Sequence, residues 1–103
     1  MIAFDDTIAA IASPAGRGGV GIVRLSGPNA LAIAHQIIQK KSLPPRMAIF
    51  TACHNEHQEL IDQGIVIYFK APHSYTGEDV IEFQMHGSPY VLAEILRLSQ
   101  VHG

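Results

Sequence analysis

The chain has 103 residues, enough for one domain built from a sheet and a few helices but too few for two domains. Its hydrophobic content of 48% and charged content of 16% indicate a globular, rather apolar protein, and its net charge of −2 argues against a broad nucleic-acid-binding surface. The single cysteine permits no internal disulfide, and the N-terminus is acidic where a secretory signal would be basic, so we expect a cytoplasmic protein. No apolar run approaches the ~20 residues that span a bilayer, so we expect no membrane segment.

The first part of the chain predicts two strands separated by a glycine-rich loop. Thr7 to Ala12 favours a short buried strand, although its alanines would also suit a helix, and SPAGRGG follows it as a Pro/Gly loop. The run VGIVRLS, which begins at Val20, is β-branched and apolar and predicts a second strand with alternating faces. Arg24 lies in the middle of this strand, where a charge is unexpected.

A helix is expected next, over residues 28–41. Gly27 is its expected N-cap and Pro28 its expected first residue, because that position does not need the amide hydrogen that proline lacks. Lys40 and Lys41 would lie in its last turn, where positive charge suits the helix dipole.

The second part of the chain predicts a β-hairpin, a further strand and a second helix. Strands over residues 47–54 and 61–69 flank the polar loop NEHQE, and Gly64 is expected to mark a β-bulge. Ser88 is the expected cap of a helix over residues 89–100. The sequence therefore predicts an α+β fold with a mixed, mostly antiparallel sheet and two main helices.

The further strand, VIEFQMH, raises the main question about function. Its alternation places Ile81, Phe83 and Met85 on a core face and Glu82 on the opposite face. A carboxylate in mid-strand needs a charged or hydrogen-bonding partner if its face is covered. From the strand alone, the more ordinary interpretation is a solvated Glu82 on the wet side of an antiparallel sheet.

Glycines in the first loop resemble a nucleotide-binding motif without meeting its requirements. Gly16, Gly18 and Gly21 have the spacing of the dinucleotide fingerprint, but a strand follows where a helix should begin. No Lys-Ser or Lys-Thr completes a Walker A motif, so we expect no nucleoside triphosphate site. The loop, with Arg17 exposed, could close over an anionic or amide-bearing ligand or could be only a turn that needs positive φ angles.

One cluster has the residue types of a metal site. Cys53, His54, His57 and Glu59 straddle the expected hairpin loop. No second ligand pair lies at structural-zinc spacing, and adjacent strand residues face opposite ways. We therefore expect no metal site there.

Three polar residues, His73, Tyr75 and Thr76, lie in the Pro/Gly loop that leads into the strand of Glu82. Polar loop residues often contact ligands, and ordinary turn chemistry explains these three equally well. Both interpretations stay open at this point.

Two long stretches, DTIAAIASPAGRGGVGIVRLSGPNA and DQGIVIYFKAPHSYTGEDVIEFQMHGSPYVL, together resemble the N-terminal domain of the MnmE (TrmE) family of tRNA-modification GTPases. The resemblance covers nearly the whole chain except residues 39–60 and rests on a glycine-rich loop, TGED and HG in this order. It implies a fold similar to the tetrahydrofolate-binding domain of glycine-cleavage T-protein. It also implies a homodimer formed through this domain, with a 5-formyltetrahydrofolate-type cofactor at the subunit interface.

The resemblance further implies that Arg24 and Glu82 hold the folate. Glu82 would anchor the pterin, because a carboxylate can accept hydrogen bonds from two adjacent donors, and Arg24 would contact a folate oxygen or orient Glu82. Additional cofactor-binding candidates are Arg17, Gly18, Tyr75, Thr76 and His86. A lysine that completes the family's site has no counterpart in these residues.

For the full-length family, the resemblance implies GTP hydrolysis with Mg²⁺ and K⁺, a flavin-containing partner, MnmG (GidA), and modification of the wobble uridine of tRNA at C5. The GTPase motifs are missing from this sequence, and the chain stops straight out of its last helix. We therefore expect residues 1–103 to be a fragment with no catalytic residues and no bound metal. Two alternatives stay open: a purely structural dimerisation module in which Arg24 and Glu82 form a cross-strand ion pair, and a folate-dependent aminomethyltransferase domain.

Overall fold

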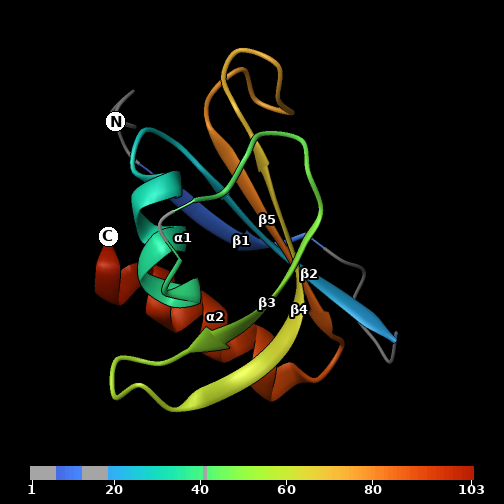
Figure 1. Ribbon diagram of the computed structural model, residues 1–103, viewed down its shortest axis with the longest axis vertical. Coiled ribbons are helices and arrows are strands. Elements are labelled where there is room, and N and C mark those ends of the chain that lie inside the picture. The colour runs from blue at the N-terminus through green and yellow to red at the C-terminus, as the bar shows by residue number, and fades with distance from the viewer. Residues whose placement is uncertain (1–6, 13–18, 41) are drawn as a thin grey trace.

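The computed structural model describes residues 7–12, 19–40 and 42–103. The described residues form a five-stranded antiparallel sheet in the order β1-β2-β5-β4-β3, with both helices packed on one side of it (Figure 1). The strands are β1 (Ile8–Ile11), β2 (Val20–Ser26), β3 (Ile49–His54), β4 (Leu60–Phe69) and β5 (Val80–His86), and the helices are α1 (Ala30–Ile38) and α2 (Pro89–His102). The predicted α+β class is confirmed. All pairings between these strands are antiparallel, and the only parallel element in the described ranges is one bridge between Pro45 and Tyr68.

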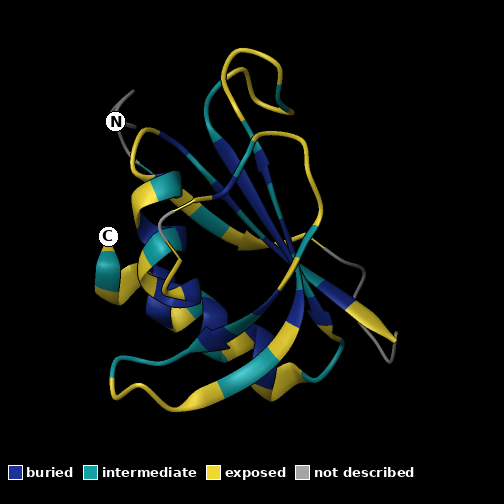
Figure 2. Ribbon diagram, in the orientation of Figure 1, coloured by how far each residue is buried: buried dark blue, intermediate teal, exposed yellow. Residues whose placement is uncertain are grey.

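The core lies between the sheet and the two helices (Figure 2). One face of β2 and β5 supplies Val23, Leu25, Ile81, Phe83 and Met85, all at most 2% exposed. Alternation therefore directs these residues toward the helices, as predicted for the three on β5, and each stabilises the fold by ~1.5–3 kcal/mol relative to an exposed position. None of the helices in the described part of the chain is long and apolar enough to cross a membrane.

Helix α1 begins later than predicted. Its N-cap is Asn29, whose backbone N–H donates to Thr7 Oγ1 at 2.9 Å. Gly27 instead has φ of 142° and donates its N–H to the Asp79 carbonyl at 2.9 Å, which ties the end of β2 to the start of β5. The prediction of Gly27 as N-cap and Pro28 as first helical residue was wrong, because the chain must first turn away from the sheet.

Helix α1 also ends earlier than predicted. Gln39 has a left-handed conformation with φ of 58° and donates its N–H to the His35 carbonyl at 2.8 Å, which closes the helix after Ile38. Lys40 therefore follows the helix and does not lie in its last turn. Lys41 lies outside the described residues.

Strands β3 and β4 form the predicted hairpin, but the bulge is not at Gly64. Gly64 pairs regularly with Thr51, and the register shifts between Cys53 and His54 instead. Gly64 is needed for close approach, because a Cβ at this position would lie 2.4 Å from the Gln84 carbonyl oxygen of the neighbouring strand. The interpretation of Gly64 as a bulge was therefore wrong.

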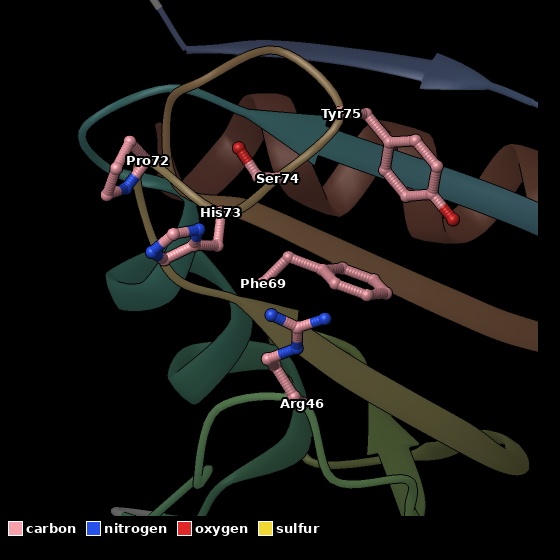
Figure 3. A pocket seen from close by; sticks show the side chains of 6 residues that line it. All are labelled: Arg46, Phe69, Pro72, His73, Ser74 and Tyr75. Atoms are coloured by element: carbon pink, nitrogen blue, oxygen red, sulfur yellow. The ribbon is translucent and has the colours of Figure 1, made fainter.

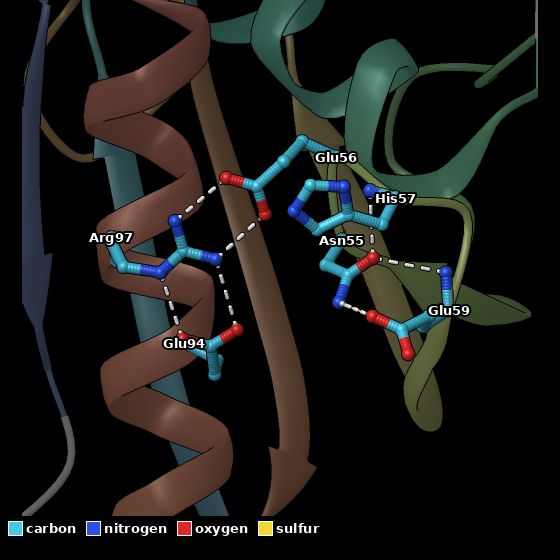
Figure 4. A network of polar contacts seen from close by, with 6 residues as sticks. All are labelled: Asn55, Glu56, His57, Glu59, Glu94 and Arg97. Carbon is cyan, nitrogen blue, oxygen red and sulfur yellow. Dashed lines mark hydrogen bonds and ion pairs between the residues drawn. The ribbon is translucent and has the colours of Figure 1, made fainter.

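The tip of the hairpin is fastened to helix α2 (Figure 4). Arg97 Nη1 and Nη2 donate to the two carboxylate oxygens of Glu56, each at 2.8 Å, and Arg97 Nε donates to Glu94 at 2.8 Å. Hydrogen bonds from Arg97 lower the pKa of Glu56 to about 2. This bidentate contact holds the β3–β4 turn against the helix layer.

Candidate functional site

Arg24 and Glu82 lie directly opposite each other on strands β2 and β5. Arg24 Nη2 donates to Glu82 Oε2 at 2.8 Å, and Arg24 Nε is 3.3 Å from the same oxygen. The Glu82 side chain is 6% exposed and that of Arg24 is 31% exposed. The interpretation of Glu82 as a solvated residue was therefore wrong, although its face of the sheet carries no helix.

The burial of Glu82 follows from its place in the sheet. Strand β5 is central, so Glu82 has Arg24 as its neighbour on β2 and Ile67 as its neighbour on β4. Its other oxygen, Oε1, accepts a hydrogen bond from Gln84 Nε2 at 2.8 Å. The carboxylate is thus charged, largely removed from water and held from two sides, which a buried carboxylate requires.

The loop between β4 and β5 packs against Arg24 of the pair. The Arg24 guanidinium carbon lies 4.1 Å from the centroid of the Tyr75 ring, a cation–π contact. Phe69 packs edge-on against Tyr75 with ring centroids 5.3 Å apart. The hydroxyls of Thr76 and Ser26 are 2.7 Å apart, which fixes the far end of the loop to β2. Two predicted site residues, Tyr75 and Thr76, are therefore brought to Arg24 and its strand.

A pocket opens beside Tyr75 (Figure 3). Its volume is about 430 Å³. It is lined by Arg46, Phe69, Pro72, His73, Ser74 and Tyr75. The sequence left open whether His73 contacts a ligand or only forms part of a turn. In the structure, His73 lines this pocket.

His86 lies apart from this cluster. It is four residues beyond Glu82 on the same strand, a separation of roughly 13 Å at the usual rise of a strand. Its Nδ1 is 2.8 Å from Asp62 Oδ1, and its backbone N–H donates to Asp62 Oδ2 at 3.0 Å. Burial acts to raise the pKa of Asp62, but the hydrogen bonds from His86 outweigh it and leave that pKa below its usual value. The predicted candidates Arg17 and Gly18 lie outside the described residues.

The cluster of possible metal ligands forms part of the hairpin and its turn. Asn55 Oδ1 accepts the backbone N–H groups of His57 and Glu59, each at 2.9 Å (Figure 4). Cys53 is fully buried, and burial, helped by the nearby charge of Asp62, raises the pKa of its thiol to about 12. Within residues 7–12, 19–40 and 42–103, no group of three or more His, Cys, Asp and Glu side chains could hold a metal ion.

Three residues of the site were not singled out from the sequence. Gln84 was expected on the face of Glu82, since it lies two positions along the strand, but no role in the site was assigned to it. No sequence pattern distinguishes Phe69 from the apolar residues of its strand that form the core. Arg46 precedes β3 in an exposed loop, and no sequence pattern connects it to the loop that carries Tyr75.

The hydrogen bonds of Glu82 limit what the site can bind. A carboxylate offers about four acceptor positions. Two are directed to Arg24 and one to Gln84, so one remains on Oε1. A ligand with two adjacent N–H donors must therefore displace the Gln84 amide or the longer bond from Arg24 Nε. Such an exchange keeps the carboxylate satisfied, because the ligand's donors replace the ones that leave.

Known proteins resemble this chain over nearly all of its length. The family model described as GTP-binding protein TrmE N-terminus matches residues 7–103. A tRNA modification GTPase MnmE of Legionella pneumophila (strain Corby) is 58% identical over 98 residues, which are 95% of this chain and 22% of that protein. The protein of the same name from Francisella tularensis subsp. novicida (strain U112) is 58% identical over 92 residues, 89% of this chain and 20% of that protein. The chain thus spans about a fifth of the length of these relatives.

Proposed function

The chain belongs to the family described as the N-terminus of the GTP-binding protein TrmE, and on this basis we propose that it binds a 5-formyltetrahydrofolate-type cofactor and forms a homodimer. Its relatives are named tRNA modification GTPases, so we propose that it acts in the modification of tRNA. The cytoplasmic location expected from the sequence stays a prediction. The relatives are longer than this chain. We propose that the regions of such a protein outside the matched residues bind GTP with Mg²⁺ and K⁺, the MnmG partner and tRNA.

The observation that supports folate binding best is the Arg24–Glu82 pair on the side of the sheet without helices. A buried ion pair is weak evidence for stability, since apolar residues of similar size often serve a fold as well. A carboxylate with one unused acceptor position, next to an arginine and an aromatic ring, is instead suited to a flat, donor-rich heterocycle such as a pterin. Glu82 is therefore assigned to the pterin donors, and Arg24 to orienting Glu82 or contacting a folate oxygen.

The alternatives account for less of the site. A purely structural module explains the ion pair but gives no role to Tyr75 over Arg24 or to the pocket that Tyr75 lines. A free-standing aminomethyltransferase is expected to carry its acidic catalytic residue on further domains, and no residue of this site is assigned that role. Folate binding without chemistry in this chain is therefore the function that we propose.

Calorimetric titration with 5-formyltetrahydrofolate tests this proposal. We expect saturable binding, but weaker than in a protein that also supplies the family's lysine. One missing hydrogen bond to a charged group costs ~1.5–3 kcal/mol, which corresponds to roughly a ten- to hundredfold weaker affinity. The same titration with an unreduced, unrelated heterocycle such as adenine should give no heat of binding. Failure of the folate to bind at millimolar concentration would refute the proposal.

The same uncovered face supports the homodimer. Val20 is 59% exposed and Phe50 is 67% exposed, and both line one shallow depression together with Ile65. Apolar side chains gathered on one face of a sheet mark an interaction surface, and a two-fold dimer would bury the same patch on both copies.

Replacing Phe50 with Lys should weaken self-association at least tenfold, since it places a charge within this apolar patch. The matched control is Tyr90→Lys, because Tyr90 is 68% exposed but lies on helix α2. Sedimentation velocity over a dilution series measures both variants. Equal weakening by the two substitutions, or a wild-type chain that is monomeric at high micromolar concentration, would contradict the dimer.

A further inference from the structure

We propose that His86 makes self-association depend on pH: two copies associate while its imidazole is neutral and separate more readily once it is protonated. This inference rests on the proposed homodimer and adds a regulatory residue to its surface. It is drawn from the position of His86 in the apolar patch, from its contact with Asp62 and from the uncharged residues around it.

His86 borders the patch that we assign to the dimer. It lines the same shallow depression as Val20, Phe50 and Ile65, which has a volume of about 210 Å³. Val20 is also its directly paired neighbour on β2. The His86 side chain is 74% exposed, so the imidazole of a single chain is open to water. A second copy placed on the patch would cover it, and the two-fold relation would cover the same ring on both copies.

Asp62 determines which ring nitrogen takes up a proton. Its Oδ1 and Oδ2 lie 2.8 and 3.0 Å from His86 Nδ1, and Oδ2 also accepts the backbone N–H of His86 at 3.0 Å. Burial acts to raise the pKa of Asp62, but these hydrogen bonds keep it below its usual value, so the carboxylate stays charged and Nδ1 carries a hydrogen toward it. Protonation of His86 therefore takes place at Nε2, which has no hydrogen-bond partner among the residues that the structure describes.

The rest of the depression offers no charge to a protonated imidazole. Its other lining residues in the described part of the chain come from β2, β3, β4 and β5 or directly precede β2, and they are apolar residues, glycines and the neutral Gln63 and Gln84. Cys53, which pairs with Asp62 across the hairpin, also stays neutral, because burial and the charge of Asp62 raise the pKa of its thiol to about 12. Asp62 is thus the one charged group of the described residues that contacts His86.

A second copy on the patch would favour the neutral imidazole. Covering Nε2 removes water from it, and this costs far more for a charged ring than for a neutral one. Asp62 stabilises the charged ring in the single chain and in the dimer alike, so it does not remove the difference. The dimer therefore binds fewer protons than two separate chains, and its affinity falls as the pH falls.

The expected effect lies in a narrow range of pH. An ordinary histidine changes charge at about pH 6.5, so we compare association at pH 7.5 and at pH 5.5. Each dimer contains two such rings, which limits the change in the dissociation constant to about a hundredfold per pH unit. A partial desolvation of both rings should raise the dissociation constant roughly tenfold between the two conditions.

Sedimentation velocity over a dilution series, at both pH values and equal ionic strength, tests this inference. His86→Asn removes the titration but keeps an amide N–H near the position of Nδ1 for Asp62, and His86→Gln is a second uncharged replacement. The matched control is His57→Asn, because His57 is exposed in the hairpin turn and does not line the depression. Melting curves at both pH values show whether each protein is folded.

The dissociation constants of wild type and His57→Asn should rise roughly tenfold at the lower pH, whereas those of the two His86 variants should change less than about threefold. A wild-type dimer with equal affinity at both pH values would overturn this inference alone, as would His86 variants that keep the tenfold change. Loss of association by both His86 variants at pH 7.5 would also overturn it, since the effect is assigned to the charge and not to the ring. A wild-type chain that is monomeric at both pH values would overturn the proposed homodimer together with it.

Discussion

Arg24→Met is expected to destabilise the fold by about 2–3 kcal/mol, because it leaves the Glu82 carboxylate buried beside a single neutral donor. Breaking a fully buried ion pair costs more than this. The estimate is reduced here since the Arg24 side chain is 31% exposed and part of its interaction is screened by water. For a chain of this size the loss corresponds to a fall in melting temperature of about 10–20 °C.

Two further variants show whether the cause is the unpaired charge. The double variant Arg24→Met with Glu82→Met should recover most of the lost stability, since an apolar pair of similar size replaces a buried ion pair at little cost. Arg97→Met, which removes an exposed arginine from two carboxylates, should cost less than about 1 kcal/mol. Thermal melts of the three variants measure this. If Arg24→Met were no more harmful than Arg97→Met, the description of Glu82 as a buried charge would be wrong.

The sequence marked the two unusual residues, and it offered their cross-strand ion pair only as one alternative, which the structure confirms. Alternation alone places Arg24 and Glu82 off the core face of their strands. That β2 and β5 are neighbours, in a register that sets these residues opposite each other, depends on pairing between segments far apart in the chain. Local pattern holds no information on such pairing, so a solvated Glu82 was the reasonable expectation for an isolated strand.

The predictions of local structure failed where tertiary contacts override the conformational preferences of single residues. Pro28 has a strong tendency to begin a helix, but the hydrogen bond from Gly27 to Asp79 delays the turn into α1. Gly64 suggested a bulge, whereas the structure requires glycine at this position because the neighbouring strand approaches too closely for a side chain. Arg46 could not be predicted as a pocket residue, because the loop that carries it meets the Tyr75 loop only in the folded chain.

Glu82→Gln is expected to abolish most folate binding while changing stability little. Glutamine keeps the size of the side chain and one acceptor oxygen, but it places an NH₂ group against the donors of the pterin. The effect should reach roughly a hundredfold, since a hydrogen bond to a charged acceptor is lost and a donor faces a donor. The fold should tolerate the change, because the remaining oxygen can still accept from Arg24, which is exposed enough to be solvated on its outer side.

Titration of wild type and Glu82→Gln with 5-formyltetrahydrofolate, accompanied by melting curves, is the most direct test of Glu82 as the pterin anchor. We predict binding by wild type, a loss of about a hundredfold in the variant, and melting temperatures within a few degrees of each other. A purely structural ion pair predicts the reverse, with a lower melting temperature and no dependence of folate affinity on Glu82. Equal folate affinities of the two proteins would contradict the assignment of the Arg24–Glu82 pair as a cofactor site.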